Sequence, residues 1–374
     1  MIPVQRPYLG QEELEAVGKV FDTRWLGMGS ATKEFEDKLR EFLGVKHVIA
    51  VNTGTSALHM ALDTLDLQPG DDVIVPSLTF VASVQAIVAV GARPIFCDVR
   101  AETLNMDMQD VFHRVTPRTK AIMPVHYGGL ACEMDDLLSF ARERKIWIVE
   151  DAAHAFGSMY NGRKVGTLGD VTCFSFDPIK NITCGEGGAV ATDNDDLAAK
   201  LIPKRILGID NDTLSRYRNE RNWFYEVTTP GYRYHLSNIN AAIGLEQLKR
   251  FDAFKARKQA IVSRYDVAFR ESAVLALIKH NLVDTFPFFY IVRVLDGRRD
   301  DLMKYLKEKG IVTGVHYIPN HIQPLFASSR VPLPVTEQVF GEIVTLPLYF
   351  EMTDSDVEKV IDAVLSFFEG NIAE

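Results

Sequence analysis

The sequence predicts an α/β fold in which helices cover both faces of a mostly parallel sheet. Short apolar and β-branched runs, such as HVIAV at 47–51 and DDVIVPS at 71–77, alternate with segments whose apolar residues recur at helical spacing. The strand runs are apolar almost throughout, which is typical of parallel strands buried on both faces. In such sheets ligands bind beyond the carboxyl ends of the strands, so functional residues are expected there.

The alternation of strands and helices begins near the N-terminus and continues to about residue 250. In chain order we predict helices at 11–21, 31–44, 55–65, 80–91 and 135–145, and strands at 47–51, 71–77, 93–99, 119–127, 146–151 and 171–176. A repeated strand–helix order indicates one sheet with helices on both faces.

The pattern changes near residue 251, where one long segment with helical spacing covers 251–272. The elements after it are a strand at 285–294, a helix at 299–310, a short strand at 311–317 and a last helix at 354–370. We therefore predict a large domain over 1–251 and a smaller α/β domain over 252–374, completed by the N-terminal helix. The polar and aromatic segment 207–230 is predicted to be an ordered excursion at the surface or at an interface.

The composition excludes several kinds of partner. The net charge is −9, from 41 Lys and Arg against 50 Asp and Glu, which argues against nucleic acid or an anionic membrane as a partner. The four cysteines, Cys97, Cys132, Cys173 and Cys184, form no CxxC pair, so neither a metal site nor a redox motif is expected. We find no signal peptide and no apolar run long enough to span a membrane, and we predict a cytoplasmic protein.

The first candidate site follows the strand at 47–51. Gly54, Thr55 and Ser56 stand between that strand and a helix, where backbone N–H groups and hydroxyls can bind an anion. In isolation a plain helix cap explains these residues better, because Ser and Thr are preferred caps.

The second candidate site is in the segment IWIVEDAAHAFGS. Glu150 and Asp151 end an apolar strand, and His154 follows three residues later. A carboxylate buried at the end of a strand needs a cationic or N–H partner, and a protonated pyridine nitrogen would serve. The alternative is a structural cap of the next helix.

The third candidate is the lysine in FSFDPIKNITCGEGGAV. Lys180 follows the predicted strand 171–176. Lysine is rarely buried unless it is paired or functional, and desolvation lowers its pKa and makes it a nucleophile able to form a Schiff base. Gly185, Gly187 and Gly188 would let the backbone approach a bulky planar ligand. A surface lysine beside a β-turn explains this segment equally well.

An aromatic residue completes the set. Phe80 follows the strand at 71–77, where its ring would cover a planar ligand, although core packing is the commoner role of Phe. An anion cup, an aromatic plate, a carboxylate and a lysine are together the parts that pyridoxal 5′-phosphate (PLP) needs. The lysine holds the aldehyde as an imine, and the carboxylate keeps the pyridine nitrogen protonated, which makes the ring an electron sink.

Longer stretches of the chain resemble the nucleotide-sugar aminotransferases of the DegT/DnrJ type, which are PLP enzymes of fold type I. The resemblance covers nearly the whole chain and rests on GTSALHMAL, GDDVIVPSLTFVAS, VEDAAHAFGSMYNGRKVGTLGD, FSFDPIKNITCGEGGAVAT and PGYRYHLSNINAAIGLEQL. PVHY, EDAAHA and IKNITC look most like the UDP-4-amino-4-deoxy-L-arabinose–oxoglutarate aminotransferases. The resemblance implies a mostly parallel seven-stranded sheet and a homodimer in which each site is completed by the neighbouring subunit.

The resemblance also implies a role for each candidate residue. Lys180 matches the Schiff-base lysine, which also carries a proton between the Cα of the amino donor and the C4′ of the cofactor. Asp151 matches the partner of the pyridine nitrogen, His154 stands near the phenolic oxygen, and Phe80 stacks on the ring. The remaining implied contacts are Gly54, Thr55, Ser56 and Ser175 to the phosphate, and His316, Tyr317 and Trp25 to the sugar.

Two places depart from the pattern of the family. The family usually reads GYNYR where this chain has GYRYH, which ends at His235, so Arg233 replaces the asparagine that reaches the phosphate of the neighbouring subunit. An arginine can also hold a phosphate. Asp177 stands where relatives often have His or an aromatic residue, and the sequence gives no physical reason for it.

The leading hypothesis is an enzyme that moves the amino group of L-glutamate to a keto carbon, by preference a 4-keto carbon, of a nucleotide-linked sugar. The pyridoxamine form of the cofactor (PMP) carries the amine, 2-oxoglutarate is released, and the amino sugar serves cell-surface polysaccharide, lipopolysaccharide or glycoconjugate synthesis. The alternatives are an aminotransferase for a cyclitol or an unactivated sugar, and a non-catalytic regulator. A nicotinamide dehydrogenase is disfavoured because no GxGxxG follows a strand. Sugar specificity is expected in the loops 24–29, 207–230 and 316–325.

Overall fold

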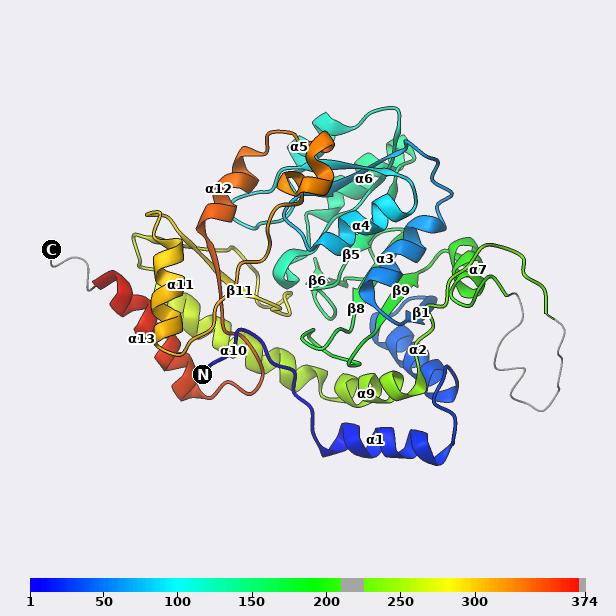
Figure 1. The fold of residues 1–374 in the computed structure, drawn as a ribbon, viewed down its shortest axis with the longest axis horizontal. Coiled ribbons are helices and arrows are strands. Elements are labelled where there is room, and N and C mark those ends of the chain that lie inside the picture. The colour runs from blue at the N-terminus through cyan, green and yellow to red at the C-terminus, as the bar shows by residue number, and fades with distance from the viewer. Residues whose placement is uncertain (210–224, 370–374) are drawn as a thin grey trace.

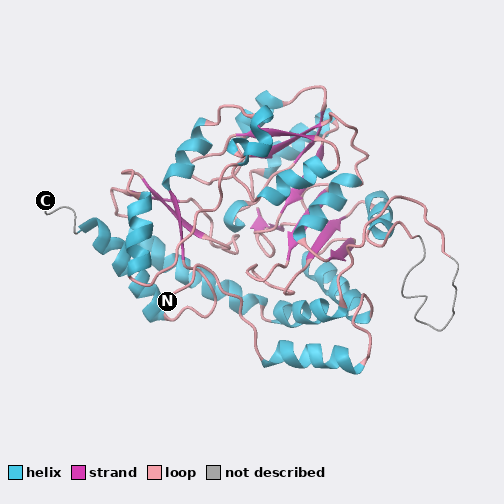
Figure 2. Ribbon diagram, in the orientation of Figure 1, coloured by secondary structure: helices cyan, strands magenta, loops and turns pink. Residues whose placement is uncertain are grey.

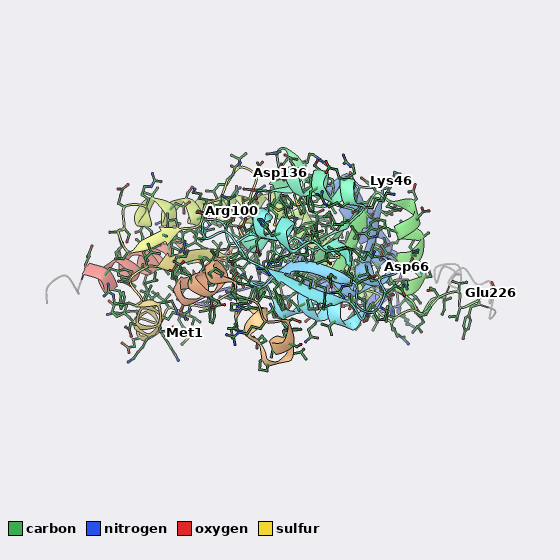
Figure 3. The ribbon with its side chains drawn as sticks, turned by 90° about the horizontal axis from the view of Figure 1, so that it is seen from above. Met1, Lys46, Asp66, Arg100, Asp136 and Glu226 are labelled. Carbon is green, nitrogen blue, oxygen red and sulfur yellow. The ribbon has the colours of Figure 1, made fainter. Side chains whose placement is uncertain are left out.

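A computed structural model describes residues 1–209 and 225–369 of the chain. Two sheets lie along the long axis of the molecule, each with its own helices (Figure 1). Seen from above, the molecule is elongated, with the C-terminal helix toward one end and Glu226 at the other (Figure 3). Most of the predicted excursion 207–230 lies outside the described residues. The assignment of 1–251 and 252–374 to two domains stays a prediction.

The larger sheet has seven strands in the order β1-β9-β8-β5-β4-β2-β3. In chain order they are β1 (His47–Val51), β2 (Asp72–Pro76), β3 (Arg93–Cys97), β4 (Thr119–Ile122), β5 (Trp147–Asp151), β8 (Val171–Ser175) and β9 (Gly188–Thr192). Neighbouring strands are parallel from β8 to β3, and β9 runs antiparallel to both of its neighbours. The predicted mostly parallel sheet of seven strands is thereby confirmed. Figure 2 shows the strands in magenta among the helices.

Successive residues of each strand alternate between two apolar layers. In β5, Ile148 belongs to one layer and Val149 to the other, and in β1 the same holds for Ala50 and Val51. The first layer contains α2 (Ser30–Leu43), α5 (Met108–Arg114), α6 (Met134–Arg144) and α9 (Asn238–Lys249), and the second contains α3 (Gly54–Asp63), α4 (Val81–Ala89) and α7 (Asp195–Lys204). Because both faces are buried, the strands are apolar at nearly every position.

The smaller sheet is antiparallel, with β11 between β10 and β12. Its strands are β10 (Leu275–Leu277), β11 (Tyr290–Val294) and β12 (Ile343–Leu346), and its helices are α10 (Phe251–Phe269), α11 (Arg299–Glu308), α12 (Pro334–Glu342) and α13 (Asp354–Glu369). Tyr265 of α10, Leu302 of α11 and Val360 of α13 share one apolar cluster with the sheet. The short elements are β6 (Met159–Tyr160), β7 (Arg163–Lys164) and the 3₁₀ turns Tyr127–Gly129, Asn320–Ile322 and Pro324–Ser329.

The prediction that the N-terminal helix completes the smaller unit is wrong. The helix α1 (Gln11–Asp22) lies along α9 instead (Figure 1). Glu13 fixes it there, because its carboxylate accepts a hydrogen bond of 2.7 Å from the side chain of Gln247. The extended residues before α1 join the smaller unit, since Ile2 forms a parallel bridge with Ile311.

Two predicted strands are shorter than the sequence suggests. The segment 311–317 forms single bridges, including one between Gly314 and Thr345, and no strand, because its later residues turn toward the larger sheet. The segment 285–294 becomes a strand at Tyr290. Before that point Phe286 belongs to the first apolar layer of the larger sheet, and Phe288 and Phe289 share a cluster with Ile291 and Ile343 of the smaller sheet. The backbone N–H of Phe288 donates to the carbonyl of Gly128 at 2.9 Å.

Candidate active site

A cavity of about 370 Å³ lies at the carboxyl ends of β2, β5 and β8, where ligands bind in parallel sheets. Its size is that of a pocket for a cofactor or a small substrate. The structure brings most of the predicted site residues to its lining, namely Gly54, Thr55, Phe80, Asp151, His154, Ser175, Lys180, His316 and Tyr317.

A tight turn after β8 holds Lys180 at the cavity. The backbone N–H of Lys180 donates to the carbonyl of Asp177 at 3.1 Å, and the Asp177 carboxylate accepts the backbone N–H of Ile179 at 3.2 Å. The Nζ of Lys180 lies 4.4 Å from the centre of the Phe288 ring. Burial lowers the pKa of Lys180 to about 8, although the Asp177 and Asp151 carboxylates act in the opposite direction. The amine is therefore much closer to neutral at physiological pH than an ordinary lysine.

Asp151 ends β5 and is 4% exposed. Its carboxylate accepts the hydroxyl of Ser83 at 2.6 Å and the backbone N–H of Ala153 at 3.1 Å. Burial raises the pKa of Asp151 above its ordinary value in spite of these two bonds. A cationic N–H group in the cavity would offset this cost of desolvation, which is what the predicted pyridine partner requires.

The amino end of α3 forms an anion cup at one end of the cavity. Thr53 caps this helix, since its Oγ1 accepts the backbone N–H of Ser56 at 3.0 Å. A Cβ on Gly54 would come within 2.7 Å of the Cβ of Ser175, so the glycine lets the helix end approach β8. The first N–H groups of a helix have no partner within it, and they are available to an anion bound in the cup.

His154 belongs to an aromatic wall of the cavity. Its ring stacks on Phe288 with centres 4.5 Å apart, and its Nε2 lies 3.0 Å from the hydroxyl of Tyr317. Burial, with the charge of Lys180, holds the pKa of His154 well below its ordinary value, so the ring is neutral. Its Nδ1 is buried and has no hydrogen-bond partner within the described part of the chain. A bound ligand would supply the partner that a buried polar atom normally has.

Phe80 lies at the amino end of α4 with 54% of its surface exposed. Its ring faces the cavity beside Tyr317, with ring centres 5.5 Å apart. The alternative of a core phenylalanine is therefore wrong. A large aromatic side chain left open at a cavity is available to cover a planar ligand.

The connecting segment 316–321 closes the cavity from the side of the smaller sheet. At one end the Nδ1 of His316 lies 2.9 Å from the hydroxyl of Thr345 in β12. At the other end the side chain of Asn320 donates to the carbonyl of Thr79, after β2, at 2.8 Å. Burial lowers the pKa of His316 to about 4, and the charge of Lys180 adds to this effect. The segment thus joins the two sheets across the site and presents an uncharged wall to it.

Three predicted residues lie outside the cavity that this single chain forms. Ser56 lies behind the cup, where its hydroxyl meets that of Thr53 at 2.9 Å. Trp25 is 41% exposed, and its indole N–H donates to the carbonyl of Met28 at 2.9 Å. Arg233 is exposed in a segment that forms a bridge with Ile206.

The sequence reasoning missed three residues that build the site. Thr53 stands directly before the Gly-Thr-Ser run and is the cap that was assigned to the residues after it. Ser83 comes three residues after Phe80, which places both at the same end of a helix facing the cavity. Asp177 was identified only as a departure from the family pattern. Its hydrogen bonds in the turn that holds Lys180 were not predicted.

The described residues contain neither a metal-binding cluster nor a membrane-spanning helix. No cluster of three or more His, Cys, Asp or Glu side chains is arranged to hold a metal ion there. In the same residues no helix is both long and apolar enough to cross a membrane.

The mostly parallel seven-stranded sheet with helices on both faces is that of a PLP-dependent enzyme of fold type I. More narrowly, the chain belongs to the DegT/DnrJ/EryC1/StrS aminotransferase family, whose model matches residues 7–365. It is thus a PLP-dependent sugar aminotransferase, in line with its structural neighbours.

The relatives match the chain from end to end. The spore coat polysaccharide biosynthesis protein SpsC of Bacillus subtilis is 37% identical over 99% of this chain and 97% of its own length. The aminotransferase TlmJ of Streptoalloteichus hindustanus is 36% identical, with a TM-score of 0.93 and full coverage of both chains. Streptococcus pneumoniae Spr1654, solved in PMP and PLP forms, is 29% identical, and its PMP form has a TM-score of 0.93 over 99% of this chain and 100% of that one.

The residues of the cavity fit this cofactor. Asp151 is buried with a raised pKa and lacks a cationic hydrogen-bond partner among the described residues, and the Nδ1 of His154 is also unpaired there. The cup that Gly54 keeps narrow has the donors that a phosphate requires. Phe80 leaves one aromatic face open to a ring.

Proposed function

We propose that this enzyme transfers the amino group of L-glutamate to a keto group of a nucleotide-linked sugar, by preference a 4-keto sugar, and releases 2-oxoglutarate. The observation that carries the proposal is the meeting of Lys180, whose pKa is lowered to about 8, with the buried Asp151 in a single cavity that also contains an anion cup. A nucleophilic amine and a buried carboxylate in that arrangement are the requirements of amino transfer with PLP.

In this proposal Lys180 attaches the cofactor and moves protons. Its neutral amine would be the nucleophile that holds the cofactor, and the free amine would take up and give back the proton of the donor's Cα. Bound PLP supplies the electron sink that makes the donor's Cα–H acidic. Asp151 would pair with the pyridine nitrogen, and the hydrogen bonds from Ser83 and Ala153 favour its charged form against the effect of burial.

The rest of the cavity orients the cofactor. Thr55 and Ser175, with the N–H groups at the start of α3, would hold the phosphate. Phe80 would cover one face of the ring, and His154, held by Tyr317, would lie at its edge. Because His154 is neutral, one ring nitrogen donates and the other accepts, so it can meet a phenolic oxygen without adding a positive charge.

The sugar would lie against the connecting segment 316–321, where His316 and Tyr317 line the cavity. Trp25 and Arg233 lie on the surface of one chain, so we assign their contacts with ligand to a homodimer in which they reach a neighbouring site. The likeness to SpsC supports a product destined for a cell-surface polysaccharide. The four buried free thiols fit a reducing compartment, and we place the enzyme in the cytoplasm.

A substrate panel tests the proposal. The purified enzyme, loaded with PLP, is given L-glutamate and in turn UDP-, dTDP- and GDP-linked 4-keto sugars, and the release of 2-oxoglutarate is followed. We expect turnover with one nucleotide class and none with the Lys180→Ala variant. If a free keto sugar or a keto-cyclitol is aminated while every nucleotide-linked sugar is refused, the proposed substrate class is wrong.

A further inference from the structure

A second buried lysine contacts the residue that follows Lys180. Lys258 belongs to α10 and is 6% exposed. Its Nζ lies 3.0 Å from the side-chain oxygen of Asn181, the residue after Lys180, and the amide nitrogen of Asn181 donates in turn to the carbonyl of Phe286 at 3.2 Å. The neutral amide thus fixes the position of the Lys258 amine without cancelling its charge. Lysine is rarely buried unless it is paired or functional.

The two lysines contact the same aromatic ring. The Nζ of Lys180 is 4.4 Å from the centre of the Phe288 ring, and the Nζ of Lys258 is 5.9 Å from the same centre. Both side chains also line a small cavity of about 20 Å³, which shares Ile179 and Lys180 with the main cavity. That volume is enough for one water molecule, and a water there would connect the two amines.

The charged surroundings of the two amines differ. Lys180 faces the carboxylates of Asp151 and Asp177, which favour a proton on it. The other titratable groups that line the main cavity with Lys180 are His154, Glu186, His316 and Tyr317. Lys258 faces the rings of Phe286 and Phe288. Arg6 lines the same small cavity, and its guanidinium is 3.3 Å from the carboxylate of Glu351. Burial lowers the pKa of Lys258 to about 7, and the charge of Lys180 adds to the effect.

We infer that Lys180 and Lys258 hold one proton between them, and that Lys258 is the positioning residue that takes this proton when Lys180 acts as a nucleophile. In the transfer an N–H bond breaks on the Lys180 ammonium and one forms on the neutral Lys258 amine, so the charge of the pair is conserved and no other reactant is needed. The shared Phe288 ring and the small cavity that both side chains line are the geometry behind this inference, and amines that interact strongly titrate as a pair, in two steps that belong to both. The inference rests on the role proposed for Lys180 and adds a residue that lies outside the lining of the main cavity.

The test measures the Lys180 amine in the enzyme free of cofactor. The protein is labelled with a trace of acetic anhydride across a series of pH values, and the modified Lys180 peptide is quantified by mass spectrometry. Wild type, Lys258→Met and Lys258→Arg are compared, with Lys255→Met as a matched control on the same helix. Lys258→Gln is a second neutral variant in case Lys258→Met does not fold, and thermal melts check the fold of each.

Opposite shifts are expected from the two kinds of substitution. Loss of the charge in Lys258→Met should raise the labelling midpoint of Lys180 by about half to one pH unit, with roughly fivefold less reactive amine at pH 7. The fixed charge of Lys258→Arg should lower the midpoint. Lys255→Met should leave it unchanged. A midpoint that stays in place in the neutral variants, or that rises equally in Lys258→Arg, would overturn the inference.

The result is independent of the proposed function. If Lys180 does not bind the cofactor, the proposed function fails in a PLP-binding measurement whatever the labelling shows. If Lys180 binds PLP in all variants and the midpoints do not move, the function stands and the shared proton does not exist.

Discussion

Glu150 and Asp151 are adjacent acidic residues at the end of β5, and they are used in opposite ways. Because side chains alternate along a strand, the two point to opposite faces of the sheet. Glu150 accepts hydrogen bonds of 2.7 Å each from His126, the backbone of Gly169 and the hydroxyl of Thr172. Burial opposes its charge, yet these donors hold its pKa below the ordinary value.

Asp151, by contrast, has two donors, a raised pKa and an open cavity beside it. The difference shows that burial alone does not mark a functional carboxylate. Glu150 is part of a closed polar network whose members satisfy one another. Asp151 is part of an open cluster, which still has hydrogen-bonding capacity for a ligand.

The largest expected effect is on the open cluster. Lys180→Ala should abolish the visible absorbance of the bound cofactor and lower turnover by more than about a thousandfold, because the nucleophile is lost. Absorbance spectra and 2-oxoglutarate release measure both effects. The unfolding temperature should change little, and turnover near that of wild type would contradict the proposed role.

Asp151→Asn should leave the cofactor bound and lower turnover by about a hundredfold or more, since a neutral amide no longer favours a protonated ring nitrogen. Cofactor content and kcat are measured on the same preparation. Ser83→Ala, which removes a donor to the carboxylate and keeps its charge, is the milder companion variant. Full activity in Asp151→Asn would remove Asp151 from the mechanism.

Glu150→Gln should damage the closed network and spare the chemistry. The backbone N–H of Cys132 donates to the Nδ1 of His126 at 3.0 Å, so the Nε2–H of His126 must donate toward residue 150. The amide NH₂ of a glutamine at position 150 would face the Nε2–H of His126, which is also a donor. If His126 changed tautomer, its Nδ1–H would face the backbone N–H of Cys132. We expect a loss of about 2–4 kcal/mol in the free energy of unfolding, with bound cofactor still visible in its spectrum. Denaturant titration measures the loss, and wild-type stability in this variant would break the comparison.

The smallest expected effect is the pH dependence due to His316. Its pKa is about 4 in the folded protein, below the ordinary histidine value, so the unfolded chain takes up a proton that the folded one refuses. Stability from this source is complete above about pH 6.5 and is lost as the pH falls toward 4. Between pH 7 and pH 5 the free energy of unfolding should therefore fall by about 2 kcal/mol less in His316→Gln than in wild type. Denaturant unfolding at the two pH values, with exposed His113→Gln as control, tests this.

Most of the fold was predictable because strands buried on both faces leave continuous apolar runs. The failures are at segments whose partners are distant in sequence. The N-terminal helix was placed by its order in the chain, and the Glu13–Gln247 contact that fixes it on α9 is not visible in a local pattern. The run at 311–317 has the composition of a strand, but its last residues turn toward the larger sheet.

In the candidate site, residues at strand ends were found because parallel topology brings strand ends together. Thr53 was missed because the helix cap stands directly before the Gly-Thr-Ser run at 54–56, and the cap was expected within that run. Asp177, which the sequence left without a reason, holds the turn of Lys180 and opposes the fall in the pKa of that lysine. Trp25 and Arg233 lie outside the cavity of the single chain, and the ligand contacts proposed for them require a second chain, which one sequence does not place.

The connecting segment 316–321 has a consequence for how the enzyme can change its substrate. One end is tied to Thr345 of the smaller sheet and the other to the backbone beyond β2, while Lys180 and Asp151 stand on elements of the larger sheet. In the proposed function, choice of substrate and chemical reaction are therefore assigned to different parts of the chain. New side chains between the two anchors can reshape the acceptor side of the cavity while the catalytic turn and the cup keep their form.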